Sequence, residues 1–571
     1  MTFRRLALVV VMLLSVAAVA YAAEGDWTMT RYDEAQSGST PQKLSPPLSL
    51  CWQYNGTKFD NNPSTPAVVG DRVYYASGDR VYALDTKSGE LKWQYPSADG
   101  LKSSIKTGVT FYDGLVMFGA TDGNVYALNA ETGRPTWLFN TQRAVRSTPI
   151  VSNGTVYVGS DDNNVYAIDA KTGEQAWSGP FRTKDDISTP CALATGLVVF
   201  ASMDSNIYGA NEASGRMRWR FQLPVAAIKG GPVVSNALVF VGSGRSVCVL
   251  STKNGLLRYK INLDSDVVAP LAMAGSDLYV ICRNKKVYAY QVGVSGYKKK
   301  WENPVSVGAT MTAPPTVAGD VLYIGCMRGM VCAYSTEDGK LLWRYTIAPS
   351  IVGNNNRHVS YTNIAAPVVV ADGALFVVTD DGALHCFRPS APDQTAPKIF
   401  NVKPRSATPM NGFPPLSFSA ILYDESTGID DSSIQLIIDN EKKDFTFDPS
   451  TLMVSYSLPI TQPLQKMSDG RHNVTIFAKD WRGNELEYSW SILIDNSLPQ
   501  RPLPKAKATA DPKAKPKRPG RTTGGTEPPP IPEGPPSPDA GGPPAPPMPP
   551  MPGEPGPGGP PPGAPGAPGP Y

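Results

Sequence analysis

Short apolar runs, each about five residues long and separated by polar turns, follow one another from about residue 50 to residue 390. In one such unit, "TVYVG" at 155 and "VYAID" at 165 are joined by "SDDNN". Runs of this length that are rich in Val, Ile and Tyr predict β-strands. Turns that contain Asn or Gly predict tight hairpins between them. The pattern therefore predicts an all-β fold.

The pattern repeats, and eight copies of one motif begin at residues 81, 125, 165, 207, 247, 287, 331 and 384. The copies are 40 to 44 residues apart, except for the last interval of 53, which contains the insertion "PSIVGNNNRHVSYTN". A unit of about 40 residues with four short strands has the size of one propeller blade. The sequence therefore predicts an eight-bladed β-propeller over residues 23–391.

The full copies share a Gly in their last hairpin and an aromatic residue on the strand that follows. Gly permits the positive φ of a tight turn, and a large aromatic ring can pack against the neighbouring blade. Tyr259 takes the aromatic place in the fifth copy. We expect a structural role for Gly89, Trp93, Gly133, Trp137, Gly173, Trp177, Gly215, Trp219, Gly339 and Trp343.

The eighth copy, "LHCFRPS", ends without a Trp of its own. Before the first full copy, however, "LSLCWQY" carries Trp52 at the matching place. We expect this N-terminal strand to pair with the strand from Leu384 to Phe387 and to complete the last blade, which removes an exposed sheet edge. A linear β-solenoid, the alternative, gives no role to this displaced half-repeat.

Two further regions follow the repeats. Residues 395–496 contain β-rich runs such as "SIQLIIDNE" and "HNVTIFAKD", whose spacing predicts a β-sandwich. Residues 499–571 hold half of the 56 prolines of the chain, so no packed core is expected there. This basic, Pro- and Gly-rich tail is either an envelope tether, a ligand for proline-binding partners or a solvated, disordered end.

The first 22 residues have the layout of a secretory signal. Arg4 and Arg5 precede an apolar run that ends at "AYA", with cleavage expected near Ala22. The run is about fifteen residues long, shorter than a spanning helix of about 20 residues. We therefore expect a mature chain without a transmembrane segment in an extracytoplasmic location, either periplasmic, cell-surface or secreted.

The net charge, the cysteines and the histidines of the chain exclude some classes of function. The formal net charge is +3, and because the leader and the tail are basic, the body is close to neutral, which argues against nucleic-acid binding. Of seven cysteines, Cys326 and Cys332 are the best local pair, with small buried strand residues as the alternative. The three histidines lack zinc-ligand spacing. The sequence predicts no catalytic residues and no metal ligands.

Basic residues before three inner strands are a first candidate binding site. Lys106, Arg146 and Lys229 precede "TGV", "STP" and "GGP", where the chain would enter the central channel. They would form a cationic mouth for an anionic ligand or partner. Asp186 and Asp266 lie at comparable places and reduce this charge, so ordinary solvated side chains are the alternative.

The insertion before the last copy is a second candidate. It contains Arg357, His358 and Tyr361. Long insertions often carry binding residues, whereas a surface loop without function is the alternative.

The repeat Ala83-x-Asp85-x-x-x-Gly89-x-x-x-Trp93 resembles that of the pyrroloquinoline-quinone (PQQ)-like propellers, over residues 26 to 390. This family includes eight-bladed quinoprotein alcohol dehydrogenases and the non-enzymatic, BamB-like assembly factors. For a quinoprotein the resemblance implies adjacent cysteines, a Glu/Asn/Asp calcium set and a catalytic Asp. No Cys-Cys pair occurs in the chain. The cofactor-binding residues therefore stay unknown.

The second region resembles the closing strands of bacterial Ig-like domains. The resemblance lies in Asp469-Gly470, His472, Ala478, Asp480 and Gly483-Asn484. It implies a spacer or adhesion role.

These patterns lead to one expectation and two alternatives. The expectation is a non-enzymatic extracytoplasmic scaffold that binds a protein or an envelope polymer and has no cofactor. The first alternative is a PQQ-dependent dehydrogenase with PQQ and calcium, and the second is a carbohydrate-binding or adhesion surface protein.

Overall fold

The computed structural model describes residues 25–57, 64–225, 230–352, 358–364, 366–405, 409–500 and 502. The expected leader and nearly all of the expected tail lie outside these residues. The described residues form strands and one 3-10 turn, η1 (Met327–Gly329), and contain no α-helix. No helix among them is long and apolar enough to span a membrane.

The repeats fold into consecutive four-stranded sheets in which neighbouring strands pair as antiparallel hairpins. The first two sheets are β3 (Ala67–Val69), β4 (Arg72–Ser77), β5 (Arg80–Asp85) and β6 (Leu91–Tyr95), then β7 (Thr110–Tyr112), β8 (Leu115–Gly119), β9 (Asn124–Asn129) and β10 (Pro135–Asn140). The next two are β11 (Ile150–Ser152), β12 (Thr155–Gly159), β13 (Asn164–Asp169) and β14 (Phe181–Arg182), then β15 (Ala192–Ala194), β16 (Leu197–Ser202), β17 (Asn206–Asn211) and β18 (Met217–Gln222).

Three more sheets continue the series. The fifth holds β19 (Val233–Ser235), β20 (Leu238–Ser243), β21 (Ser246–Ser251) and β22 (Leu257–Asn262). The sixth holds β23 (Ala272–Ala274), β24 (Asp277–Ile281), β25 (Lys286–Gly293), β26 (Gly296–Lys299) and β27 (Val305–Ser306). The seventh holds β28 (Thr316–Ala318), β29 (Val321–Gly325), β30 (Met330–Ser335) and β31 (Leu341–Thr346). A short strand from the N-terminal segment, β1 (Ser39–Thr40), pairs in parallel with β28 at the inner edge of this sheet.

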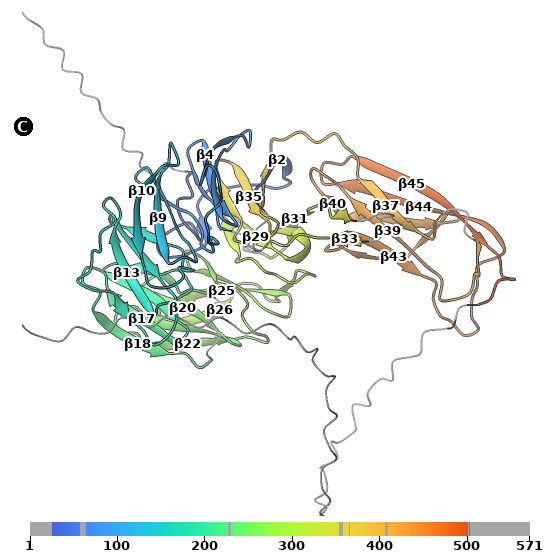
Figure 1. Ribbon diagram of the computed structural model, residues 1–571. Helices are drawn as coiled ribbons and strands as arrows, with labels where there is room; N and C mark the ends of the chain where they lie inside the picture. The colour runs from blue at the N-terminus through green and yellow to red at the C-terminus, as the bar shows by residue number, and fades with distance from the viewer. Residues whose placement is uncertain are drawn as a thin grey trace, which may run out of the picture. The chain divides into compact units, whose positions relative to one another are not determined.

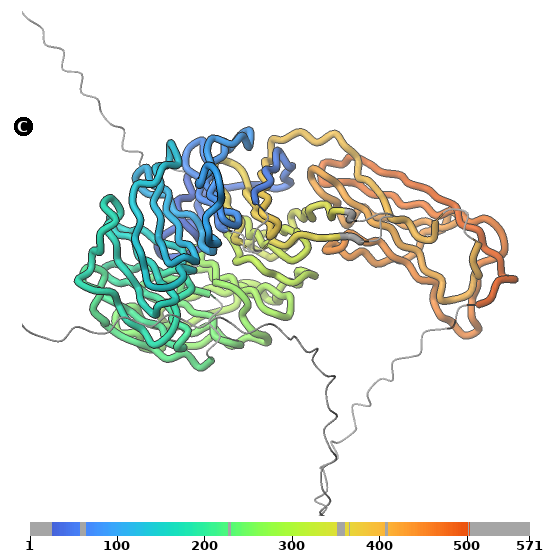
Figure 2. Tube along the Cα trace, in the orientation of Figure 1, coloured from blue at the N-terminus to red at the C-terminus, as the bar shows by residue number. Residues whose placement is uncertain are grey.

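The last sheet of the series joins the two ends of the repeat region. β2 (Ser49–Asn55) pairs with β36 (Ala383–Arg388), which continues into β35 (Ala374–Val378) and β34 (Val369–Ala371). Trp52 lies opposite Cys386, and Tyr54 lies opposite Leu384. Figures 1 and 2 show the blue β2 beside the yellow strands of this sheet. The expected pairing of Trp52 with the strand from Leu384 to Phe387 is confirmed.

The core lies between neighbouring sheets. One cluster joins Val73 and Tyr75 of the first sheet to Phe376 and Cys386 of the last one, all buried. Equivalent clusters join the other neighbours. Each sheet therefore buries both faces, which explains why its inner strands are apolar almost throughout.

The Trp and Gly residues of the repeat form the junctions between sheets. The Trp93 indole Nε1 donates to Ala130 O at 2.8 Å, in the hairpin of the next sheet. A Cβ on Gly133 of that hairpin would lie 2.6 Å from the same ring, so only Gly fits. The same hydrogen bond to the next hairpin is made by Trp52, Trp137, Trp177, Trp219 and Trp301.

Residues 398–494 form a second, two-sheet unit, here called the C-terminal module. One sheet contains β37 (Lys398–Lys403), β39 (Ser417–Tyr423), β43 (Met453–Ser457) and β42 (Thr446–Asp448). The other contains β38 (Pro409–Met410), β45 (Glu485–Ile494), β44 (Gly470–Asp480), β40 (Ile429–Ile438) and β41 (Glu441–Lys443). Buried side chains from both sheets share one core.

The C-terminal module is hydrogen-bonded to the seventh sheet through the turn of residues 424–428, here called the docking turn. Trp343 Nε1 donates to Thr427 O at 2.9 Å, and the Tyr345 hydroxyl donates to Glu425 O at 3.0 Å. From the other side, Trp481 Nε1 donates to Arg344 O at 3.0 Å. The Trp343 side chain therefore finds its acceptor in the module and not in a neighbouring blade.

Candidate functional site

An N-terminal segment, residues 27–40, crosses the inner strands of the propeller. It accepts backbone hydrogen bonds from Phe111, Leu193, Val234, Met273 and Val317 at 2.6 to 2.9 Å. These donors belong to or adjoin the inner strands of five different sheets. The segment therefore lies along the inner ends of these five sheets.

A cavity of about 200 Å³ lies between this segment and the inner strands. Five of its lining residues are prolines that precede inner strands, such as Pro190, Pro270 and Pro314. Polar atoms come from two sources. The N-terminal segment supplies Thr30, Arg31 and Gln36, and the residues just before inner strands supply Thr65, Lys106 and Thr148.

Arg31 is the charged centre of the cavity. Its side chain is 3% exposed, Nη1 donates to Pro315 O at 2.8 Å, and Nη2 donates to Leu271 O. Its Nε is buried without a hydrogen-bond partner. Burial lowers the pKa of Arg31 to about 10, opposed by the charge of Asp33. No described carboxylate lies within ion-pair distance of this guanidinium, so the site favours an anion.

The structure describes two of the three basic residues expected at the channel mouth. Lys106 lines the cavity. Arg146 instead pairs with the buried carboxylate of Asp161, and Lys229 lies outside the described residues. Sequence reasoning missed Arg31, because no repeat pattern covers it and its two carbonyl partners lie more than 200 residues away along the chain.

The insertion contributes to the contact with the C-terminal module. Arg357 and the side chain of His358 lie outside the description, although the backbone of His358 belongs to β33 (His358–Ser360), which pairs with β32 (Ser350–Val352). The Tyr361 hydroxyl donates to Thr451 O at 3.0 Å. The Arg328 guanidinium lies over the Tyr361 ring at 5.5 Å.

The carboxylates in the acidic turns of the repeats accept hydrogen bonds from neighbouring residues of the same sheet. Asp122 Oδ2 accepts a 2.6 Å hydrogen bond from the Tyr126 hydroxyl, and its Oδ1 accepts from the Asn124 amide. Asp162 and Tyr166 repeat this pair. These carboxylates therefore stabilise turns, as their sequence context predicts.

The other candidate groups are buried in strands. His385 takes the place of the repeat Tyr, and burial lowers its pKa to about 4. Cys326 and Cys332 are buried thiols, and no bridge between them is formed in this structure.

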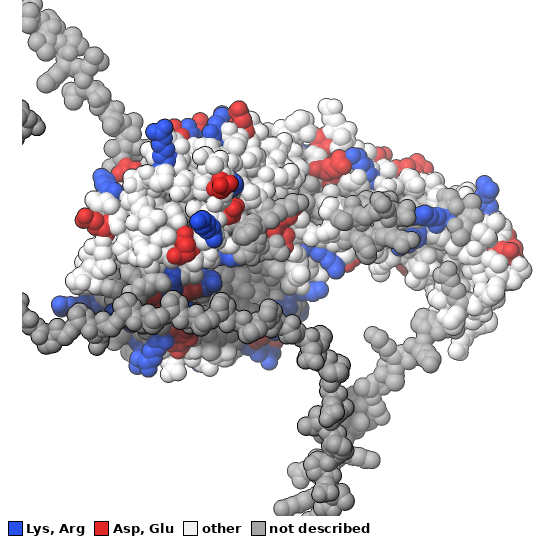
Figure 3. All heavy atoms as spheres, viewed as in Figure 1, with Lys and Arg blue, Asp and Glu red and all other residues white. Residues whose placement is uncertain are grey.

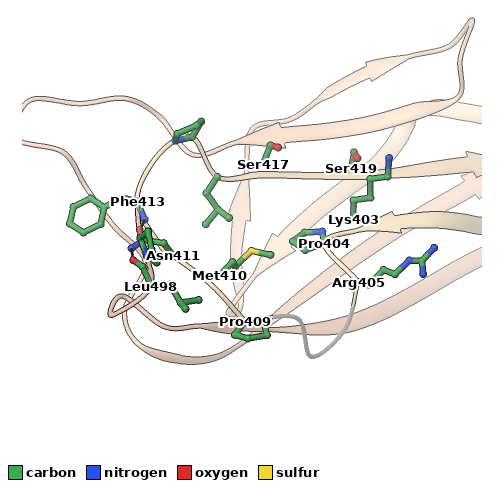
Figure 4. A pocket seen from close by; sticks show the side chains of 13 residues that line it. Lys403, Pro404, Arg405, Pro409, Met410, Asn411, Phe413, Ser417, Ser419 and Leu498 are labelled. Atoms are coloured by element: carbon green, nitrogen blue, oxygen red, sulfur yellow. Dashed lines mark hydrogen bonds between the residues drawn. The ribbon is translucent and has the colours of Figure 1, made fainter. Parts of the chain in front are cut away.

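A larger hollow of about 570 Å³ lies in the C-terminal module (Figure 4). Lys403 and Arg405 are its charged residues, and Met410, Pro404 and Phe413 supply much of its apolar surface. The described lining holds no acid, His or Cys. Figure 3 shows acidic and basic side chains interspersed over the visible face of the protein. We therefore take the channel cavity, with its buried cation, as the candidate site.

The consecutive sheets, their closure through β2 and the Trp–Gly junctions define a β-propeller protein built from PQQ-type repeats. The family model described as outer membrane protein assembly factor BamB matches residues 97–202 and 203–408, more than half of the chain. The chain belongs to this family. A second model, for the β-propeller domain of glucose, ethanol and alcohol dehydrogenases, matches residues 45–146.

The curated relatives that the chain matches are alcohol dehydrogenases, and a solved structure shares its fold. The 1-butanol dehydrogenase (cytochrome c) of Thauera butanivorans is 31% identical over 141 residues, which are 22% of this chain and 20% of that protein. The quinohemoprotein alcohol dehydrogenase of Comamonas testosteroni is 34% identical over 124 residues, 20% of this chain and 17% of that protein. The chain thus matches about a fifth of the length of these relatives. The solved Comamonas testosteroni enzyme shares the fold, with a TM-score of 0.52 and 16% identity over 68% of this chain and 83% of that one.

These relatives correct three expectations. The non-enzymatic scaffold, the absence of enzyme activity and the absence of a cofactor are all contradicted, because the curated relatives are dehydrogenases and include quinohemoproteins. These expectations rested on the missing Cys-Cys pair, which does not exclude quinone binding by the other residues of a channel. The expected fold class, by contrast, is confirmed as an all-β propeller.

The cavity fits part of a quinone site. Arg31 and Lys106 offer positive charge and N–H donors to the carboxylates of a PQQ-type cofactor. The described lining includes no Asp, Glu or Asn, so it does not fit a calcium ion or a carboxylate base. At about 200 Å³ it would hold one end of such a molecule, because whole ligands occupy about 300 Å³ or more. We therefore place no metal-assisted step there.

Proposed function

We propose that the channel cavity binds a quinone that carries carboxylate groups, of the PQQ class, and that the protein is a quinone-dependent alcohol dehydrogenase. The observation that carries the proposal is the buried guanidinium of Arg31, which has an unpartnered Nε and no described carboxylate within ion-pair distance. A buried cation of this kind costs free energy unless an anion compensates it. The curated quinoprotein relatives supply the identity of the anion.

The residues of the chain have distinct parts in this proposal. Arg31 would donate from Nε to a carboxylate of the cofactor, while Lys106 adds a second positive charge. The hydroxyls of Thr65 and Thr148 would hydrogen-bond to polar edges of the ligand. When bound, the quinone accepts two electrons and two protons from an alcohol, which leaves as the carbonyl compound.

Reconstitution tests the proposal directly. The full chain, treated with EDTA, is mixed with PQQ with or without Ca²⁺ and separated from free quinone by gel filtration. We expect quinone absorbance to elute with the protein and 1-butanol to reduce an added dye. Arg31→Gln should weaken quinone retention at least tenfold, whereas Arg146→Gln, which removes an arginine paired outside the cavity, should not. A wild-type chain that retains no quinone contradicts the proposal.

We also propose the signal cleavage, the domain boundaries and the partner class that the sequence predicts. The chain would be exported and cleaved near Ala22, with residues 23–391 and 395–496 as separate domains and the second of Ig-like type. The two sheets of the C-terminal module and their common core support that assignment. A protein or an envelope polymer would be the partner. N-terminal sequencing of the secreted chain tests the cleavage, since a mature start far from residue 23 contradicts it.

A further inference from the structure

Three carboxylates from separate parts of the chain meet at the base of the C-terminal module. Asp393 precedes β37, Asp424 follows β39, and Asp480 ends β44. One oxygen of each lies within 4.8 Å of one oxygen of each of the others. Asp424 and Asp480 are buried, at 3% and 2% exposure. Like charges this close repel strongly in a buried site unless a cation or protons compensate them.

Hydrogen bonds account for most of the carboxylate oxygens and leave one without a partner. Asp480 Oδ2 accepts from Asn484, and Asp393 Oδ2 accepts from the Thr427 hydroxyl. Asp424 Oδ1 accepts three backbone N–H groups of the docking turn, at 2.7 to 2.9 Å. Asp424 Oδ2 is buried and has no partner. Since Oδ1 already accepts three hydrogen bonds, Oδ2 is the oxygen of Asp424 that is left for a ligand.

No positive side chain in the described part of the chain neutralises the cluster. Among the described residues, no Lys, Arg or His forms an ion pair with Asp393, Asp424 or Asp480, although neighbouring acids such as Glu425 and Asp431 do. The site as it stands therefore holds more negative charge than its surroundings compensate.

We propose that Asp393, Asp424 and Asp480 bind a calcium ion. Carboxylate oxygens are the ligands that hard divalent cations prefer, and the cluster contains no nitrogen or sulfur ligand that would favour zinc. Calcium accepts irregular sets of six to eight oxygens, with water completing the sphere, whereas magnesium demands a nearly ideal octahedron. This site is independent of the quinone proposed for the channel.

The ion would fix the docking turn. That turn supplies Ser426 O to the Leu50 amide and Thr427 O to the Trp343 indole, both from the propeller. The ion would tie the turn, through Asp393, to residues 389–397 between β36 and β37, here called the connecting segment, and, through Asp480, to the end of β44. Calcium binding therefore stabilises the contact between the propeller and the C-terminal module.

Terbium luminescence tests the proposal on the full chain after EDTA treatment. Terbium takes calcium sites, and Trp481, next to Asp480, is placed to sensitise it. We expect micromolar terbium binding that calcium displaces, and a rise of several degrees in the melting temperature with calcium. Asp424→Asn and Asp393→Asn should each weaken binding at least tenfold. Glu425→Gln is the matched control, because this neighbouring acid pairs with Lys398 outside the cluster.

The experiment distinguishes the absence of a calcium site from a calcium site made by other residues. Wild-type protein that binds neither terbium nor calcium at millimolar concentration overturns the proposal, whatever the variants do. Variants that bind as the wild type does overturn the assignment to these three residues. Circular dichroism shows whether Asp424→Asn folds, and Asp393→Asn, in the connecting segment, provides an independent test if it does not. Loss of calcium should also expose the connecting segment to protease in the wild type.

Discussion

The regular junctions between propeller sheets differ from the junction that Trp343 makes. In the regular ones, an aromatic side chain donates to a backbone carbonyl in the hairpin of the next sheet, as Trp93 does to Ala130 and Tyr259 does to Gly293. Trp343, on the outer strand of the seventh sheet, instead donates to Thr427 O of the C-terminal module. Its ring is fully buried, whereas Trp93 and Trp137 are only partly buried.

The difference follows from how the propeller closes. The outer strand of the last sheet is β2, which comes from the N-terminal end of the chain. No hairpin can therefore connect β36 to its outer strand, and the Gly and the carbonyl that Trp343 would use are missing. The docking turn supplies both an acceptor and a close backbone contact, because a Cβ on Gly428 would lie 2.7 Å from Arg344 O. The module thus takes the place of the hairpin that the last sheet lacks.

The largest expected effect concerns a regular junction. Gly133→Ala places a Cβ 2.6 Å from the Trp93 ring and strains a φ of +68°. Strain and overpacking cost about 1–3 kcal/mol each, so we expect a loss of about 4 kcal/mol. Gly114→Ala is the control, because it has a φ of +76° and nothing within 4 Å of the added Cβ. Denaturant unfolding measures both, and equal losses would show that the ring contact is unimportant.

Trp343→Phe tests the exceptional junction. The variant leaves the buried Thr427 carbonyl without its donor, which costs about 2 kcal/mol. Trp137→Phe, at a regular junction with a partly exposed indole, should cost about 1 kcal/mol. Limited proteolysis provides the second measurement. We expect faster cleavage between the propeller and the module in Trp343→Phe alone, and equal cleavage in both variants would contradict a docking role.

Much of the propeller could be predicted from the sequence, because its information is local and repeated. Trp52 revealed the closure, since its place in the repeat was vacant after Phe387. The partners of Arg31 and Trp343 could not be predicted, because they lie on loops that only the folded chain brings close. Asp424 shows the same limit. In sequence it is an ordinary turn acid, and only the fold places it beside Asp393 and Asp480.

The last sheet should also differ from the regular ones in its response to acid. Three of the regular sheets carry a Tyr–Asp pair, such as Tyr126 and Asp122, where the last sheet has His385. The pKa of His385 lies at about 4 in the folded protein, below the 6.5 of an unfolded chain. The unfolded state therefore binds the proton first, and stability is lost as the pH falls from 6.5 towards 4.

We expect this histidine to cost about 2 kcal/mol of stability between about pH 7 and about pH 5. His385→Tyr restores the residue of the regular repeat and should remove that part of the pH dependence. The measurement compares unfolding of the two proteins at several pH values. Parallel curves for the wild type and the variant would mean that His385 is not the group responsible.

The smallest expected effect concerns the second contact with the C-terminal module. Tyr361→Phe removes the hydroxyl that donates to Thr451 O at 3.0 Å but keeps the ring beneath Arg328. Because this contact is partly exposed, we expect a loss of about 0.5–1 kcal/mol. Tyr297→Phe, at an exposed tyrosine of β26, is the control and should change nothing. A loss as large as that of Trp343→Phe would show that the insertion carries as much of the docking free energy as the turn does, and Trp343 would then have no special part in docking.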